Sequence, residues 1–204
     1  MSKSTLLLEI GLEEMPARFV TKARQELQSK VEDWLKEKRL EYTAVKSFAT
    51  PRRLAVKVEQ VPDQQPDMET EARGPSEKIA RNDGEWTKAA LGFAKGQGVD
   101  TDDLYLQEVK GERYVFALKK TTGKRTMELL PELRGVLLDL TFPKNMKWGS
   151  YQLRYVRPVK WLTAVFGTDV IPFEITGIPT GRITYGHRFL GDAADISNAD
   201  DYEE

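Results

Sequence analysis

Residues 47–58, "SFATPRRLAVKV", place two arginines directly after a proline, at the start of an alternating apolar run. From Leu54 onward every second residue is large and apolar, which predicts a strand with one buried face. Arg53 falls on the same face as Lys57 and is expected to face solvent. Arg52 falls in line with Leu54, so its stem is expected to cover the edge of the core while its guanidinium finds a partner.

The two arginines have two interpretations. In the first, Pro51 fixes φ in a turn, and the arginines solvate the beginning of the strand, as charged side chains commonly do. In the second, the arginines bind an anion such as a phosphate. This stretch alone leaves both interpretations open.

A β-α-β-β unit is predicted around this run. The apolar residues 5–11 predict its first strand, and Pro16 suits the first turn of a helix. Residues 41–49 and 52–61 predict two further strands. The helix is amphipathic, with apolar residues at spacings of three and four: Val20, Ala23, Leu27, Val31 and Trp34.

A second unit is predicted further along the chain. Its expected elements are a helix at 87–95, a hairpin of strands at 104–109 and 114–118, a helix at 127–140, strands at 156–166 and 170–175, and an extended segment at 183–190. The predicted fold class is α+β, with two packed α/β-layer units whose antiparallel or mixed sheets are covered by helices. The predicted divisions are an N-terminal unit at 1–62, a linker or long loop at 63–75, a second unit at 76–191 and an acidic end at 192–204.

The acidic end predicts a truncated helix. Ser197 is followed three residues later by Asp200, a pattern typical of a helix N-cap, and residues 192–204 hold six acids and no base. A helix of one turn is too short to be stable alone. The chain is therefore expected to be the N-terminal fragment of a longer protein.

Composition excludes several kinds of site. The 204 residues contain no cysteine and one histidine, His187, so disulfides, cysteine nucleophiles and the usual zinc sites are excluded. No apolar run approaches the roughly 18 residues that span a bilayer, so no membrane association is expected. The predicted compartment is the cytoplasm. The net charge of −1 hides a basic stretch, because residues 142–190 carry seven Lys or Arg and two acids.

No catalytic constellation emerges from the motifs. There is no G-x-S-x-G elbow and no phosphate loop, and the adjacent Glu13 and Glu14 are expected to complement a helix start. The stretch "FPKNMKWG", residues 142–149, interleaves Lys144 and Lys147 with aromatic side chains. Nucleic-acid surfaces use that combination, with charge for phosphates and rings for bases, although it also suits a connection whose rings fill the core.

Several stretches together point to one family. They are "LLLEIGLEEMP" (6–16), "FATPRRLAV" (48–56), "RGP" (73–75), "KAALGFAKGQGV" (88–99), "FPKNMKW" (142–148), "RYVRPVKW" (154–161) and "YGHRF" (185–189). In this order and spacing they resemble the N-terminal part of the β subunit of bacterial glycyl-tRNA synthetase, the heterotetrameric type with two α and two β subunits. The resemblance covers essentially the whole chain.

The resemblance implies a division of labour. Glycine activation, with ATP and Mg, would occur on the α subunit, and this segment would need no cofactor and hold no catalytic residue. Its partners would be the α subunit and tRNA(Gly), and an HD-like domain and an anticodon-binding domain would follow beyond residue 204. Alone, the fragment is expected to be inactive. The candidate RNA-binding residues are Arg52, Arg53, Lys144, Lys147, Arg157, Lys160, His187 and Arg188.

Three functions from different classes compete. The segment could contact RNA within a ligase, or it could be a protein-docking scaffold that joins the subunits and touches no RNA. The third is an enzyme that holds a small anion with Arg52, Arg53 and Arg188. It ranks last, because no acid, base or nucleophile lies near those arginines in the sequence.

Overall fold

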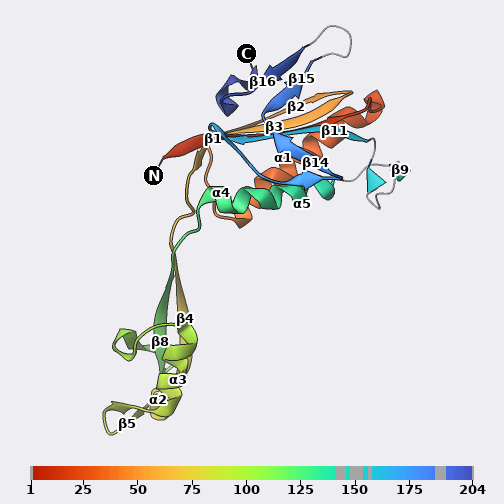
Figure 1. Ribbon diagram of the computed structural model, residues 1–204. Helices are drawn as coiled ribbons and strands as arrows, with labels where there is room; N and C mark the ends of the chain where they lie inside the picture. The colour runs from red at the N-terminus through yellow and green to blue at the C-terminus, as the bar shows by residue number, and fades with distance from the viewer. Residues whose placement is uncertain (1, 141–145, 148–153, 156–157, 187–191, 204) are drawn as a thin grey trace. The chain divides into compact units, whose positions relative to one another are not determined.

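The chain forms two units, and the second is inserted into the sequence of the first. The structure, a computed structural model, describes residues 2–140, 146–147, 154–155, 158–186 and 192–203 (Figure 1). The first unit comprises residues 1–65 and 124–204, and the second comprises residues 66–123. The prediction of an α+β fold with antiparallel and mixed sheets covered by helices is confirmed.

The first unit is built on a sheet whose strand order is β13-β14-β11-β1-β3-β2, with β12 also paired to β11. Its strands are β1 (Lys3–Leu12), β2 (Ala44–Thr50), β3 (Arg53–Pro62), β11 (Val159–Phe166), β12 (Asp169–Val170), β13 (Glu174–Ile175) and β14 (Ile178–Gly181). All the pairs are antiparallel except β11 with β14. β1 is central because both of its edges are paired and both of its faces are apolar over most of its length.

Helices cover one face of this sheet (Figure 1). They are α1 (Ala17–Glu37), α4 (Thr126–Leu129), η2 (Leu130–Glu132) and α5 (Leu133–Leu138). The predicted stripe of α1 is confirmed, because Ala23, Leu27, Val31 and Trp34 are buried and Val20 packs beside them. The helix predicted at 127–140 is broken into three pieces, because Pro131 lacks the N–H that a continuous helix would use.

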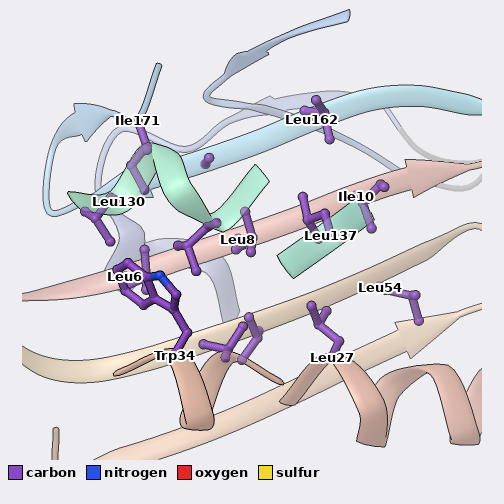
Figure 2. Packing of buried hydrophobic residues seen from close by; sticks show 14 of the residues in the cluster. Leu6, Leu8, Ile10, Leu27, Trp34, Leu54, Leu130, Leu137, Leu162 and Ile171 are labelled. Carbon is purple, nitrogen blue, oxygen red and sulfur yellow. The ribbon is translucent and has the colours of Figure 1, made fainter. Parts of the chain in front are cut away.

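The core lies between the helices and the sheet. Figure 2 shows Leu6, Leu8 and Ile10 of β1 beside apolar side chains of the helices, including Leu27 and Leu137, and all five are completely buried. Alternation therefore places the even-numbered residues of β1 against the helices and the odd-numbered ones on the opposite face.

The opposite face of the sheet is also covered. β15 (Ile183–Tyr185), β16 (Ala193–Asp195) and the 3₁₀-helix η3 (Ala199–Glu203) contribute to this cover, and Ile196 and Ala199 pack on Leu7 and Val165. The end of the chain is therefore a short strand and a 3₁₀ turn, where a helix start was predicted. It is held against the sheet by burial of apolar side chains.

The second unit is a three-stranded sheet with helices on one face. Its order is β4-β8-β7, all antiparallel, and a core of small and branched side chains that includes Ala90, Ala94 and Val115 lies under the helices. The predicted hairpin is confirmed as β7 and β8, joined at Lys110 and Gly111, both at positive φ. The elements are β4 (Met68–Ser76), α2 (Glu77–Ala80), β5 (Arg81–Asn82), β6 (Glu85–Trp86), α3 (Lys88–Gln97), η1 (Thr101–Asp103), β7 (Leu104–Val109) and β8 (Glu112–Thr121).

The predicted boundaries need correction. Most of the segment at 63–75 belongs to β4, a strand that pairs with β8, and so it is not a linker. The sequence does not show this strand, because its residues are largely polar and none of them is fully buried. The predicted unit at 76–191 is divided, because the chain returns to the first unit at Lys124 and β11 pairs with β1. The remaining strands, β9 (Met146–Lys147) and β10 (Arg154–Tyr155), form an antiparallel pair.

Candidate functional site

The structure describes the side chains of three of the eight predicted site residues. They are Arg52, Arg53 and Lys160. Lys147 lies in β9, paired in register with Arg154. The other four, Lys144, Arg157, His187 and Arg188, lie outside the described residues.

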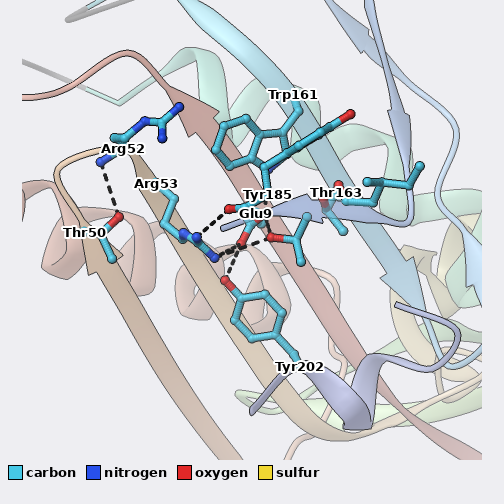
Figure 3. Close-up of polar contacts among 10 residues, drawn as sticks. Glu9, Thr50, Arg52, Arg53, Trp161, Thr163, Tyr185 and Tyr202 are labelled. Atoms are coloured by element: carbon cyan, nitrogen blue, oxygen red, sulfur yellow. Dashed lines mark hydrogen bonds and ion pairs between the residues drawn. The ribbon is translucent and has the colours of Figure 1, made fainter. Parts of the chain in front are cut away.

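Arg53 is held inside the protein by an acidic partner. Its Nη1 lies 3.6 Å from Glu9 Oε2, its Nη2 donates to the Tyr185 carbonyl at 2.5 Å, and its side chain is only 22% exposed (Figure 3). The prediction that Arg53 faces solvent is therefore wrong. Its parity with Lys57 is correct, but β15, β16 and η3 cover that face, and Lys57 is itself buried.

Glu9 organises this covered face. The carboxylate is completely buried, and it accepts a hydrogen bond from Trp161 Nε1 at 2.6 Å and one from Thr184 Oγ1 at 2.6 Å, both to Oε1. Its Oε2 accepts from the Tyr202 hydroxyl and faces the Arg53 guanidinium. The donors come from β3, β11, β15 and η3 (Figure 3), so one carboxylate ties four elements to β1. A glutamate inside the apolar run of 5–11 was the signal available in the sequence, and sequence reasoning did not use it.

The C-terminal 3₁₀-helix is docked on the same face. Lys57 Nζ donates to the Asp200 carbonyl at 3.1 Å, and the Thr5 hydroxyl donates to the Asp200 carboxylate. The Phe48 and Tyr202 rings meet edge to face, with centroids 5.5 Å apart. η3 is therefore fixed by polar and aromatic contacts together.

Tyr202 is expected to make the docking sensitive to alkaline pH. Burial, reinforced by the negative charge of Glu9, raises the pKa of Tyr202 well above its ordinary value of about 10. Because the folded-state pKa is raised, the stabilisation is present below pH 10 and is lost as pH rises above it. We expect the free energy of unfolding to fall with pH above 10, and Tyr202→Phe to remove part of that fall. Urea unfolding from pH 8 to 11.5 measures this fall, with Tyr42→Phe at an exposed position as control. An equal dependence of the free energy of unfolding on pH in the two variants would contradict the contribution of Tyr202.

A pocket opens beside this network, at the turn before β3. It has a volume of about 660 Å³ and is lined by Leu12, Glu13, Glu14, Arg52, Lys160, Trp161 and Tyr185. Two backbone bonds fix its rim, Leu12 N–H to the Arg52 carbonyl at 2.7 Å and Met15 N–H to the Pro51 carbonyl at 2.5 Å. The pocket therefore lies where the segment after β1 meets the "TPRR" turn.

Arg52 faces this pocket. The prediction that it continues the alternation of β3 is wrong, because β3 begins at Arg53 and Arg52 belongs to the turn. Its N–H donates to Thr50 Oγ1 at 3.3 Å, and its Nη1 is buried without a hydrogen-bond partner among the described residues. On the same rim, Lys160 Nζ lies 2.9 Å from Glu13 Oε1. Of the two arginines predicted from the sequence, Arg53 thus belongs to the network around Glu9, and Arg52 lines the pocket.

The aromatic side of the pocket depends on a glycine. Trp161 packs directly on Gly11, its partner in the β1–β11 register, and a Cβ at Gly11 would lie 1.9 Å from the indole ring. Trp161 is 7% exposed and meets the Tyr185 ring with centroids 5.1 Å apart, whereas Tyr185 is 43% exposed. The Tyr185 ring, which is partly exposed, is therefore packed against the fixed Trp161 ring.

Neither a metal-binding cluster nor a membrane-crossing helix is present among the described residues. In the part of the chain that the structure describes, no three His, Asp or Glu side chains lie close enough together to form a metal site. Within the same residues, no helix has both the length and the apolar character that crossing a bilayer requires.

Comparisons with known proteins agree on one family. A family model described as "Glycyl-tRNA synthetase beta subunit" matches residues 6–204. The chain is 56% identical to the glycine–tRNA ligase beta subunit of Bacillus subtilis and 55% identical to that of Halalkalibacterium halodurans, in both cases over 100% of the chain and 30% of the relative. The identity to that of Listeria monocytogenes is 51%, over 99% of the chain and 29% of the relative. The chain thus spans about 30% of the length of these relatives.

Proposed function

Because the chain belongs to the glycyl-tRNA synthetase beta subunit family, we propose that it supports tRNA binding and assembly in a glycine–tRNA ligase. The resemblance carried by the seven motifs is confirmed over the whole chain. In this proposal the partners are the α subunit and tRNA(Gly), and glycine activation with ATP and Mg belongs to the α subunit. The chain by itself then carries no chemistry.

The observation that carries RNA contact is the pocket at the "TPRR" turn. A guanidinium nitrogen without a hydrogen-bond partner among the described residues, a lysine and a half-exposed tyrosine lie together there. Nucleic-acid surfaces use cations for phosphates and rings for bases. Arg53 supports the site indirectly, because its guanidinium binds the carbonyl of Tyr185. The remaining candidates, Lys144, Lys147, Arg157, His187 and Arg188, stay proposed RNA contacts.

Salt dependence tests this function. We expect Arg52→Gln to weaken tRNA binding by the complex with the α subunit and to flatten the plot of log affinity against log salt by about one unit of slope. Lys160→Gln should flatten it less, because Lys160 is already paired with Glu13. The measurement is tRNA affinity at four or more salt concentrations, with the exposed Lys22→Gln on α1 as control. Identical slopes in all the variants would refute RNA contact at this pocket.

A protein-docking scaffold is the second candidate, and an observation in the second unit favours it. On the face of its sheet opposite the helices, the Tyr105 and Phe116 rings stack with centroids 6.0 Å apart, and Arg73 lies 3.6 Å from the centre of the Tyr114 ring. Tyr105 is 39% exposed. Aromatic and arginine side chains are enriched at protein interfaces. Loss of co-purification with the α subunit in Tyr105→Ser, with tRNA affinity unchanged, would favour the scaffold.

The cytoplasm is the proposed compartment. The whole chain lacks cysteine, as suits a reducing environment in which disulfides do not form. Cell fractionation with an antibody to the protein measures the distribution directly.

A further inference from the structure

We propose that the pocket lined by Arg52, Lys160 and Tyr185 binds one unpaired nucleotide of an RNA strand, with the base on Tyr185 and the phosphate on Arg52. The inference rests on the proposed function, because it names the part of an RNA that the pocket would take. It goes beyond a phosphate-contacting surface, since it requires a flipped or single-stranded base.

The aromatic wall is preorganised for stacking. Tyr185 exposes its ring while Trp161 supports it from behind, with centroids 5.1 Å apart and planes inclined by 60°. Trp161 cannot easily shift, because its Nε1 donates to the buried Glu9 at 2.6 Å and its ring lies on Gly11. The backbone of Tyr185 is held in turn by Arg53. Because the ring is already fixed, a base can stack on it without the entropic cost of ordering a mobile side chain.

The cationic side of the pocket lacks an acceptor. Arg52 Nη1 is buried and has no hydrogen-bond partner in the described parts of the chain. Leaving a buried charged donor unsatisfied is unfavourable, and almost all such groups in proteins have a partner. A phosphate oxygen would satisfy it with a charge-assisted hydrogen bond. Arg52 therefore marks the end of the pocket where the anionic part of a ligand belongs.

The acidic residues restrict the ligand further. Glu13 and Glu14 also line the pocket, and Glu13 is paired with Lys160 at 2.9 Å. Two carboxylates disfavour inorganic phosphate or a small dianion, but they can accept hydrogen bonds from the exocyclic amine of a base or from ribose hydroxyls. A volume of about 660 Å³ accommodates a nucleotide, which combines an anion, hydrogen-bond donors and a flat ring.

The experiment measures binding of a fluorescent five-nucleotide single-stranded RNA to the full 204-residue chain. We expect about tenfold weaker binding for Arg52→Gln and at least about fivefold for Tyr185→Leu. Tyr185→Phe keeps the ring and should retain more affinity than Tyr185→Leu. Lys22→Gln removes a charge elsewhere, so it should stay within about twofold of the wild type. Melting curves establish that every variant is folded. In competition, a nucleoside 5′-monophosphate should displace the RNA at lower concentration than inorganic phosphate.

Several results would overturn the inference in distinguishable ways. If inorganic phosphate displaced the RNA as well as the nucleotide did, the pocket would be an anion site that does not stack a base. RNA binding that is insensitive to Arg52→Gln and Tyr185→Leu, while the complex still binds tRNA, would reject the pocket and leave the proposed function intact. Loss of binding to the α subunit in these two variants, with RNA affinity unchanged, would make a protein the occupant. Failure of the intact complex to bind tRNA would reject the proposed function itself.

Discussion

Glu9→Ala is expected to lower the free energy of unfolding of the first unit by about 3–5 kcal/mol. The substitution removes the acceptor for Trp161, Thr184 and Tyr202, and it leaves the Arg53 guanidinium without its counter-ion. Breaking one side of a buried ion pair is costly because the remaining charge stays desolvated. Arg53 keeps 22% exposure, which places the expected loss toward the lower end of this range.

Urea unfolding measures this loss, followed by the fluorescence of tryptophans that include Trp34 and Trp161 of the first unit. Glu9→Gln should be intermediate, because an amide keeps an acceptor but loses the charge. Glu41→Ala, on the exposed surface before β2, should change the free energy by less than about 0.5 kcal/mol. A loss below about 1 kcal/mol for Glu9→Ala would mean that the network contributes little to stability.

Gly11→Ala is expected to destabilise the same unit by about 3 kcal/mol, at the upper end for overpacking. The new methyl would lie 1.9 to 2.2 Å from three atoms of the Trp161 ring, so one partner must shift at the expense of its own contacts. Gly11 lies in the paired strand β1, and Trp161 is bonded to Glu9. The displaced indole would also remove the support of Tyr185, so binding at the pocket should weaken together with stability.

The matched control for this prediction is Gly92→Ala in α3. A Cβ there meets no atom within 4 Å, so the change should stabilise the helix by about 0.5–1 kcal/mol. The double variant Gly11→Ala/Trp161→Leu should recover part of the loss, because a smaller side chain relieves the overlap. Gly11→Ala that is as stable as the wild type would contradict the close packing of Trp161 on β1.

Local periodicity was enough to predict the elements whose partners are near in sequence. The α1 stripe, the strand after the "TPRR" turn and the β7–β8 hairpin were predicted correctly, because each shows its own pattern within about twenty residues. The pairing of β11 with β1 joins residues such as Leu6 and Phe166, and no local pattern specifies a partner at that distance. β4 was missed because its exposed, polar sequence carries no alternation.

The surroundings of the two arginines were predicted only in part, and for the same reason. The doubled arginine pointed to the turn before β3, but parity alone assigned Arg53 to solvent and Arg52 to the core edge. The assignment of Arg53 was wrong because the layer over its face comes from residues 183–185 and 193–203, more than a hundred residues later, and that of Arg52 was wrong because Arg52 belongs to the turn before β3. Glu9, on which the arrangement depends, stands inside an otherwise apolar strand. A carboxylate in such a run indicates a buried polar network, because a buried charge needs partners.

The second unit interrupts the first between β3 and β11, and its own pairing brings its two ends together. Met68 is in register with Thr121, and Gly123 N–H donates to Asp67 Oδ1 at 2.8 Å. Next to this junction, Gln65 N–H donates to the Lys124 carbonyl at 2.9 Å. If the insert folds first, it shortens the effective loop that separates the two halves of the larger sheet, and each halving of a loop lowers the entropic cost of closure by about 0.6 kcal/mol. The inserted unit then folds before the sheet that surrounds it in sequence. β11 can pair with β1 across a shorter effective loop, which favours faster folding.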